Sequence, residues 1–149
     1  MIHLTNDQLA AITGAAEAAY PDECCGLLAG FAVDGGWRVS RVVESRNVTE
    51  SDHRDSFEVD PQVRFDLMRA LDDDAGERMI GHYHSHPDHP ARPSERDRAM
   101  AYEPELVWII VSVAEGRAQA TGAFRLNAAG DAFDEIDITV TDRPEESAP

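Results

Sequence analysis

Four of the six histidines lie in one short stretch, residues 81–97, where their spacing could build a metal site. His84 and His86 alternate along a segment with the composition of a strand, so their side chains project from one face, about 6 to 7 Å apart at their bases. Two imidazoles at that separation can converge on one ion. His82 shares this face, so the spacing alone leaves open which of the three histidines bind.

A serine and an aspartate follow on the far side of a proline-containing loop. The prolines take the chain out of the strand, and Ser94 is a favourable N-cap for a short helix. Asp97, in the first turn, could direct its carboxylate back to the histidines. Each residue alone has an ordinary explanation, a helix cap for Ser94 and a dipole-favoured acid for Asp97. Together they predict a catalytic zinc site, because three protein ligands leave the fourth tetrahedral position open to water.

The order of these residues resembles the signature of the JAMM (MPN+) metallopeptidases, with His84-Ser85-His86, seven residues, Ser94, two residues and Asp97. This family also has a glutamate far upstream, at a helix-to-strand junction. Residues 21–30 resemble that segment, with Glu23 in the matching position. Three more residues resemble the bacterial and archaeal members: Asn47, Phe57 and Pro61.

The resemblance implies that His84, His86 and Asp97 bind one zinc ion per chain, leaving out the third histidine of the strand. It implies that Glu23 activates the bound water and passes its proton to the leaving amine, while Ser94 steadies the tetrahedral oxyanion. The implied fold is an MPN (cytidine-deaminase-like) α/β sandwich, a mixed central sheet flanked by helices. The implied activity is hydrolysis of a peptide or isopeptide bond after the C-terminal Gly-Gly of a ubiquitin-like or sulfur-carrier protein, which is the expected partner.

Other interpretations are open. A noncatalytic MPN module could act as a protein-binding scaffold, although such relatives typically lack the ligands. Cys24 and Cys25 could supply a thiol nucleophile paired with a histidine, but free cysteines in an apolar strand are usually small core residues. A zinc deaminase would need paired thiolates and a His-x-Glu motif, which this sequence lacks. His53 and His89 are expected in loops, where either could line a substrate groove.

The elements that position these residues follow from hydrophobic periodicity. Helices are predicted at residues 6–19, 61–71 and 94–101, the first from a capping box formed by Thr5 and Gln8. The second has an expected apolar face of Val63, Leu67, Met68 and Leu71. Strands are predicted at residues 24–30, 37–48, 57–59, 79–86, 106–113, 119–126 and 133–141. This pattern indicates an α/β domain around a mixed sheet, but it does not give the strand order.

Composition limits the class of protein further. A chain of 149 residues with 42% hydrophobic side chains suits one domain, which we place at residues 1–141, with residues 142–149 as a disordered tail. The net charge of -16, with arginine as the only strongly basic residue, argues against a nucleic-acid partner. No apolar run reaches the length of a membrane helix and no signal-peptide pattern begins the chain, so we expect a cytoplasmic protein without a membrane partner. The sequence leaves a homodimer open.

Overall fold

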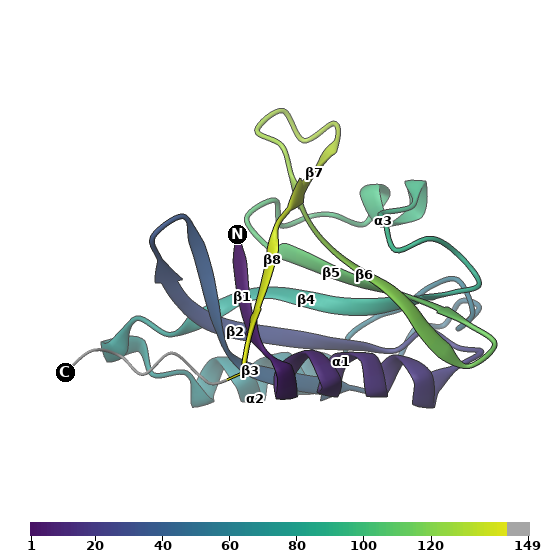
Figure 1. Cartoon of the computed structure of the whole chain (residues 1–149), viewed down its shortest axis with the longest axis horizontal. Helices are drawn as coiled ribbons and strands as arrows, with labels where there is room; N and C mark the ends of the chain where they lie inside the picture. The colour runs from purple at the N-terminus through teal and green to yellow at the C-terminus, as the bar shows by residue number, and fades with distance from the viewer. Residues whose placement is uncertain (143–149) are drawn as a thin grey trace.

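An eight-stranded mixed sheet forms the centre of the computed structural model, which describes residues 1–142 (Figure 1). The strands are β1 (Ile2–Thr5), β2 (Cys25–Val33), β3 (Gly36–Ser45), β4 (Arg78–Pro87), β5 (Val107–Ala114), β6 (Arg117–Leu126), β7 (Phe133–Ile136) and β8 (Ile138–Thr141). Their order across the sheet is β7-β6-β5-β4-β2-β3-β1-β8. The helices are α1 (Asn6–Ala19), α2 (Pro61–Ala70), α3 (Glu95–Ala99) and the 3-10 helix η1 (Asp73–Ala75). The expected α/β architecture with a mixed sheet flanked by helices is confirmed.

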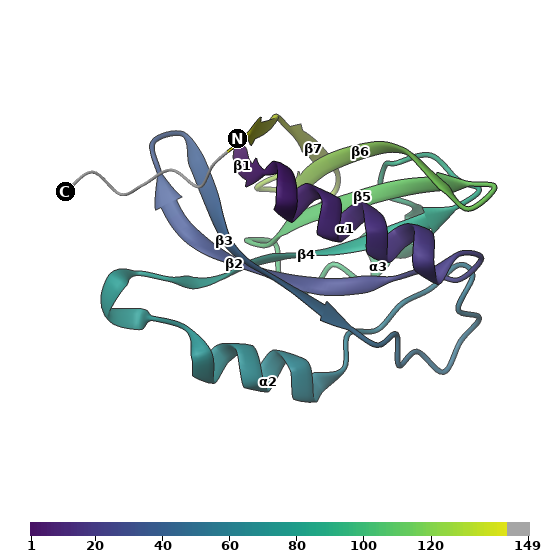
Figure 2. The same cartoon turned by 60° about the horizontal axis from the view of Figure 1, so that its bottom comes forward.

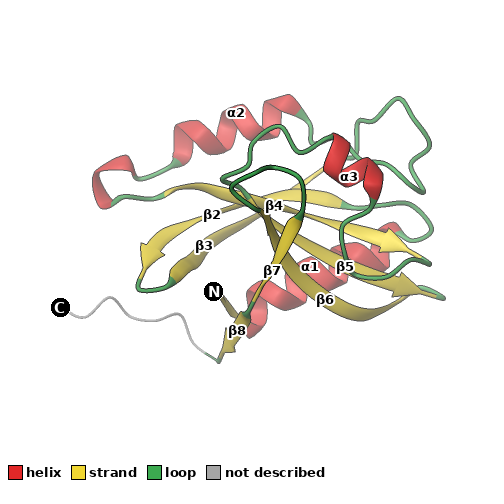
Figure 3. Cartoon of the chain, turned by 90° about the horizontal axis from the view of Figure 1, so that it is seen from above, coloured by secondary structure: helices red, strands yellow, loops and turns green. Residues whose placement is uncertain are grey.

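The sheet separates two apolar layers. On one face, α1 buries Ile12 and Ala16 in a cluster that includes Ile109 of β5. On the other face, Leu67 of α2 packs in a cluster with Leu27 of β2. Figure 3 shows α2 and α3 on the same side of the sheet and α1 on the opposite side, and Figure 2 shows α1 lying across the strands.

The strand β4, which carries the predicted site, is buried because it lies in the middle of the sheet. It pairs antiparallel with β2 and parallel with β5. All residues from 80 to 87 are buried. Gly81 permits the close approach of β5, since a Cβ atom at this position would lie 2.1 Å from the carbonyl oxygen of Val107. The site residues are therefore built on a strand that is held on both sides.

The last two strands lie at opposite edges of the sheet, although only Asp137 separates them in the sequence. The sheet must therefore curl until its edges meet near this residue. In Figure 1, β8 passes in front of the central strands and β7 stands above them. The N–H of Ile2 donates to the carbonyl of Asp137 at 2.9 Å, which ties β1 to the crossing point. The single strand predicted at residues 133–141 is wrong, because the chain changes edge midway.

Some strand boundaries also differ from the prediction. The strand β1 was not predicted, because four residues are too few to show a reliable period. Residues 57–59 form no strand, and they contribute only an isolated bridge between Val59 and Asn47. The strand β3 ends at Ser45 rather than at residue 48. The segment after it leaves the sheet and passes beside the predicted site.

The predicted helices are all present. The first matches residues 6–19, with the expected capping box at Thr5. The second ends at Ala70, and its predicted apolar face is wrong in one member, because Met68 is 50% exposed. The third is shorter than predicted, with Ser94 outside it as the N-cap and Ala99 as its last residue.

The predicted tail lies almost entirely outside the described residues. Its first residue, Asp142, accepts a hydrogen bond from the side chain of Asn6, and residues 143–149 are not described. The single-domain assignment for residues 1–141 stays a prediction. Within residues 1–142, no helix is long and apolar enough to cross a membrane.

Candidate active site

Two predicted metal ligands meet at the end of β4. His84 and His86 occupy alternate positions, so both side chains face the α2 and α3 side of the sheet. Their Nε2 atoms lie 3.1 Å apart. His84 is fully buried and His86 is 7% exposed. The alternation of the strand thus produces the convergence that the spacing predicted.

The capping box of α3 brings Asp97 to the same point. Its N–H donates to the Ser94 hydroxyl oxygen at 3.0 Å, and its carboxylate accepts from the Ser94 N–H at 2.9 Å. The same carboxylate lies 3.0 Å from Nε2 of His86 and 3.4 Å from Nε2 of His84. The cap and the site are therefore not competing explanations of Asp97, because the cap fixes the turn that aims the carboxylate at the histidines.

Glu23 completes the cluster from the junction of α1 and β2. It is 4% exposed, and its Oε1 atom has no hydrogen-bond partner within residues 1–142. It offers one ligand atom in a group with His84 and His86 in which all three atoms lie within 4.8 Å of one another. The Glu23 backbone is held on both sides, because its N–H donates to the His53 carbonyl at 2.7 Å and its carbonyl accepts from Asn47 at 3.3 Å.

Side-chain hydrogen bonds connect the residues on either side of Glu23 to β4 and to the residue that follows it. Ser85 points to the opposite face from its histidine neighbours, and its hydroxyl accepts the N–H of Cys24 at 2.8 Å. Tyr20, at the end of α1, donates its hydroxyl to the Asp88 carboxylate at 2.9 Å. Sequence reasoning selected neither contact. A signal existed for Ser85, because a buried strand hydroxyl needs a hydrogen-bond partner.

Burial and mutual contacts shift the pKa values of the residues in this cluster. Burial raises the pKa of Glu23 to about 8, although the charge of His86 opposes this shift. Burial lowers the pKa of His84, which favours the neutral imidazole that binds metals. Burial also acts to raise the pKa of Asp97, but hydrogen bonds with the two histidines outweigh it and hold this pKa well below its usual range. A bound cation would be the largest local charge and would favour the ionised form of both carboxylates.

The donor atoms fit a zinc ion. Zinc bonds of 2.0–2.1 Å in tetrahedral geometry separate neighbouring ligand atoms by about 3.3 Å. The distances among His84, His86 and Asp97 are 3.0, 3.1 and 3.4 Å. Since Glu23 also lies within reach of both histidines, either carboxylate could complete the ligand set on geometry alone.

His82 lies beside the cluster rather than in it. Its ring is in contact with Trp108 at 4.3 Å and with Phe57 at 5.6 Å between centroids. Burial lowers its pKa to about 3. Its ring centroid is 5.9 Å from that of His84, and the ring contacts on its other sides are aromatic. The third histidine of the strand is therefore an aromatic core residue.

The two cysteines lack the surroundings of a nucleophile. Burial raises the pKa of Cys24 to about 11 and that of Cys25 to about 12. The Cys25 thiol faces the carbonyl oxygens of Ser45 and Arg46 at 3.9 and 3.6 Å, not an imidazole. This environment argues against thiol chemistry, because the thiolate is the reactive form.

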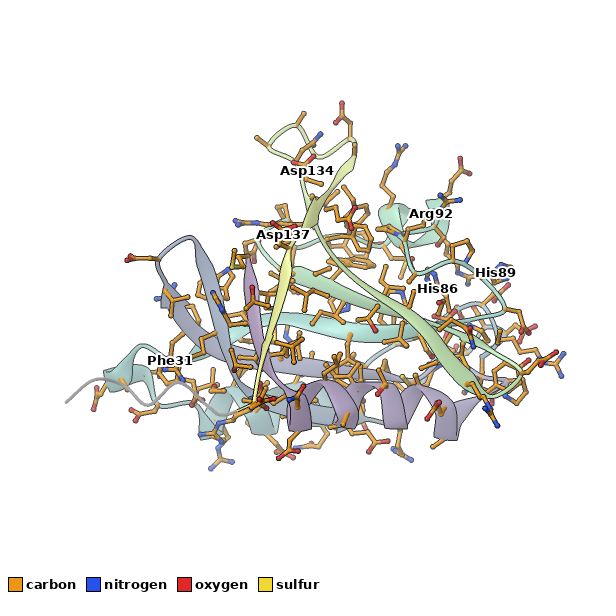
Figure 4. All side chains as sticks on the ribbon, viewed as in Figure 1. Phe31, His86, His89, Arg92, Asp134 and Asp137 are labelled. Atoms are coloured by element: carbon orange, nitrogen blue, oxygen red, sulfur yellow. The ribbon has the colours of Figure 1, made fainter. Side chains whose placement is uncertain are left out.

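Two more histidines, His53 and His89, lie in loops, as expected. His53 is half-buried, and its ring contacts the carbonyl of Thr49 at 2.9 Å. His89 is exposed in the loop after β4, and its N–H donates to the carbonyl of His86 at 3.4 Å (both are labelled in Figure 4). Neither histidine belongs to the group of Glu23, His84 and His86 whose possible ligand atoms lie within 4.8 Å of one another.

A comparison with protein families finds a match between residues 5–127 and the prokaryotic homologs of the JAB domain. The fold agrees with this class, because a JAB1/MPN domain protein from Archaeoglobus fulgidus superposes with a TM-score of 0.58 at 22% identity, covering 93% of this chain and 96% of that one. The chain belongs to the prokaryotic JAB (JAMM/MPN) family.

Individual relatives agree with this assignment. The chain is 32% identical to a desampylase of Haloferax volcanii over 80% of this chain and 79% of that protein. It is 29% identical to the CysO-cysteine peptidase of Mycobacterium tuberculosis over 93% and 85% of the two chains. A protein of Desulfitobacterium hafniense has a structure with a TM-score of 0.82 at 32% identity, over 97% and 96% of the chains. One of these relatives is named a peptidase, which supports the assignment of this chain as a hydrolase.

Proposed function

We propose that this chain is a zinc-dependent metallopeptidase that hydrolyses a peptide or isopeptide bond after the C-terminal Gly-Gly of a ubiquitin-like or sulfur-carrier protein. One observation supports this above all others, the convergence of His84, His86 and Asp97 within 3.0–3.4 Å of one another beside the buried Glu23. We assign the two histidines and Asp97 as the ligands of one zinc ion. Zinc at this site would supply a Lewis acid that polarises a carbonyl and makes water more acidic.

Glu23 suits the role of the proton carrier. Its unpartnered Oε1 is free to accept a proton from a water molecule and to deliver it to the leaving amine. Its pKa of about 8 without a cation would fall beside one, which brings it towards the neutral range where a general base works best. Glu23 also has less competition for its oxygens than Asp97, which the Ser94 N–H already engages.

Ser94 suits the role of an oxyanion donor. Its oxygen accepts the Asp97 N–H in the capping box, and this contact leaves the hydroxyl hydrogen available, because a serine hydroxyl accepts and donates at the same time. A donor held in place before the reaction lowers the barrier where negative charge develops. The cap thus fixes the Ser94 oxygen close to the proposed ligands.

The substrate class is inferred from the relatives, one of which is a desampylase and another a CysO-cysteine peptidase. A flexible Gly-Gly tail suits a site bordered by extended backbone, and residues 49–57 are the proposed wall. This wall is anchored beside the site, because the Asn47 side chain donates to the carbonyls of both Ser56 and Glu23. A cytoplasmic location and the lack of a nucleic-acid partner stay predictions from composition.

Cleavage assays test this proposal. The zinc-loaded chain is incubated with Gly-Gly-terminated fusions and isopeptide conjugates, including the ubiquitin-like proteins of its own cell. We expect cleavage directly after the second glycine, inhibition by a chelator, and no cleavage by Glu23→Gln. A chain that binds zinc but cleaves none of these substrates would contradict the assigned activity. Failure to bind zinc as well would favour a noncatalytic scaffold.

A further inference from the structure

The two proposed histidine ligands are held in different ways. Metal-binding histidines almost always donate their second ring N–H to a carboxylate, a carbonyl or water, which fixes the orientation of the ring. His86 follows this rule, because its Nδ1 lies 2.9 Å from the carbonyl oxygen of Pro90. The Nδ1 of His84 is buried and has no hydrogen-bond partner among residues 1–142. Another contact must therefore orient the His84 ring.

The ring of Phe57 supplies such a contact. It stacks on His84 with centroids 4.2 Å apart and an interplanar angle of 17°. Trp108 stands nearly perpendicular to the same imidazole, at 5.6 Å and 81°. The χ2 torsion of histidine is broad when nothing restrains it. A parallel ring at 4.2 Å restrains it, because rotation of the imidazole out of its plane would drive its edge into Phe57.

Phe57 is itself fixed by its neighbours in the sequence. The Asn47 side chain donates to the Ser56 carbonyl at 2.9 Å and accepts from the Glu58 N–H at 3.0 Å. One amide group thus holds the backbone on both sides of Phe57. The N–H of Val48 adds a bond to the Glu58 carbonyl at 2.9 Å. This explains how a residue outside regular secondary structure can act as a fixed support.

We propose that Phe57 is a positioning residue for His84, and that its stacked ring takes the place of the missing hydrogen bond in keeping Nε2 directed at His86 and Asp97. This inference rests on the proposed zinc site. The ring sets the orientation of one ligand and makes no contact with the metal. Phe57 therefore contributes to zinc affinity, separately from any part that residues 49–57 play in substrate binding.

The test measures zinc affinity in full-length variants by competition with a chelating dye. Phe57→Leu keeps an apolar side chain but removes the flat ring, and we expect its zinc dissociation constant to rise about tenfold, as for the loss of a hydrogen-bond partner of a metal ligand. Phe57→Tyr keeps the ring and should bind zinc like the unaltered chain. Phe133→Leu is the matched control, because Phe133 contacts Trp108 at 5.1 Å in the same aromatic cluster and has no ring contact with His84.

A second measurement separates orientation from stability. The visible absorption of bound Co²⁺ depends on ligand geometry, so Phe57→Leu should change the spectrum while Phe57→Tyr and Phe133→Leu should not. Thermal unfolding of the metal-free forms shows whether each variant is folded, and Phe57→Met replaces Phe57→Leu if the latter is not. Unchanged affinity and spectrum in the ring-deleting variant would overturn this inference and leave the proposed function standing. Absence of zinc binding in the unaltered chain would instead overturn the proposed function.

Discussion

The hydroxyl of Ser85 accepts a hydrogen bond from the backbone N–H of Cys24 at 2.8 Å. Ser85 lies between the two proposed histidine ligands, and Cys24 directly follows Glu23. This bond therefore couples the strand that carries the ligands to the backbone next to Glu23, the proposed base. Both partners are buried, so neither can exchange the bond for water.

Ser85→Ala should slow cleavage more than it weakens zinc binding. Loss of the hydroxyl leaves the Cys24 N–H buried without a partner, at a cost of about 1–3 kcal/mol in the free energy of unfolding. A small displacement of Glu23 should lower kcat about 10- to 100-fold. Zinc affinity should be retained, because β4 keeps its pairing with β5.

The matched control for this variant is Ser112→Ala. Ser112 is a buried serine of β5 whose hydroxyl accepts the N–H of Ala120 at 3.1 Å, within the β5–β6 pair. The Ser112→Ala variant should lose a similar amount of the free energy of unfolding, with little change in kcat. Equal kcat losses in both variants would show that Ser85 acts only through stability.

His82→Phe should keep zinc binding. The histidine is neutral at working pH, because burial lowers its pKa to about 3, and its Nδ1 has no partner among the described residues. An apolar ring at this site removes the unsatisfied nitrogen and keeps the contacts with Trp108 and Phe57. We therefore expect an equal or higher melting temperature and an unchanged zinc dissociation constant. Loss of zinc binding in His82→Phe would contradict this expectation and show that His82 is a ligand.

Cys24 and Cys25 should be dispensable for the chemistry. Both are buried and have raised pKa values, so iodoacetamide should not inactivate the folded chain. The double variant Cys24→Ala, Cys25→Ala should lose stability through the small cavities it creates, yet keep its cleavage rate while folded. A rate that falls with alkylation would support the thiol mechanism instead.

Glu77 should make stability depend on acid pH. Its buried carboxylate accepts hydrogen bonds from Arg41 at 3.0 Å, from the Asp72 N–H at 3.0 Å and from Ser40. The Arg41 contact above all lowers its pKa from 4.5 to about 2. Because the folded pKa is the lower one, the stabilisation is complete above pH 4.5 and is lost as the pH falls to about 2.

Urea unfolding of Glu77→Gln measures this effect. Near neutral pH the variant should lose on the order of 1 to 2 kcal/mol in the free energy of unfolding, less than the full equivalent of the pKa shift, because the Arg41 partner is 41% exposed and solvent screens the pair. The difference from the unaltered chain should shrink steadily as the pH is lowered towards 2. A difference that stays constant with pH would contradict the assigned pKa of Glu77.

Local patterns predicted the helices and the central strands because each carries its own periodicity. The alternation of β4 and the cap at Ser94 also predicted that strand histidines converge with Asp97, since both are properties of neighbouring residues, but they left open whether His82 takes part. Glu23 could not be derived in this way. It reaches His84 and His86 only through the pairing of β2 with β4, and sequence reasoning selected it by family resemblance alone.

The contacts that the sequence did not reveal are long-range or lie outside regular structure. The crossing at Asp137 depends on how the sheet closes, which the 133–141 pattern cannot show. The stack of Phe57 on His84 depends on Asn47 holding a segment that has no period. Such positions follow from tertiary hydrogen bonds, which hydrophobic patterning does not encode.

Zinc content tests the central claim most directly. The purified chain and its variants are dialysed against zinc and then against buffer, and metal is counted by mass spectrometry. We predict one zinc ion per chain, retained in Glu23→Gln and lost in His84→Ala, His86→Ala and Asp97→Ala. A chain without zinc, or a Glu23→Gln variant that loses the metal while Asp97→Ala keeps it, would contradict this assignment of the two carboxylates.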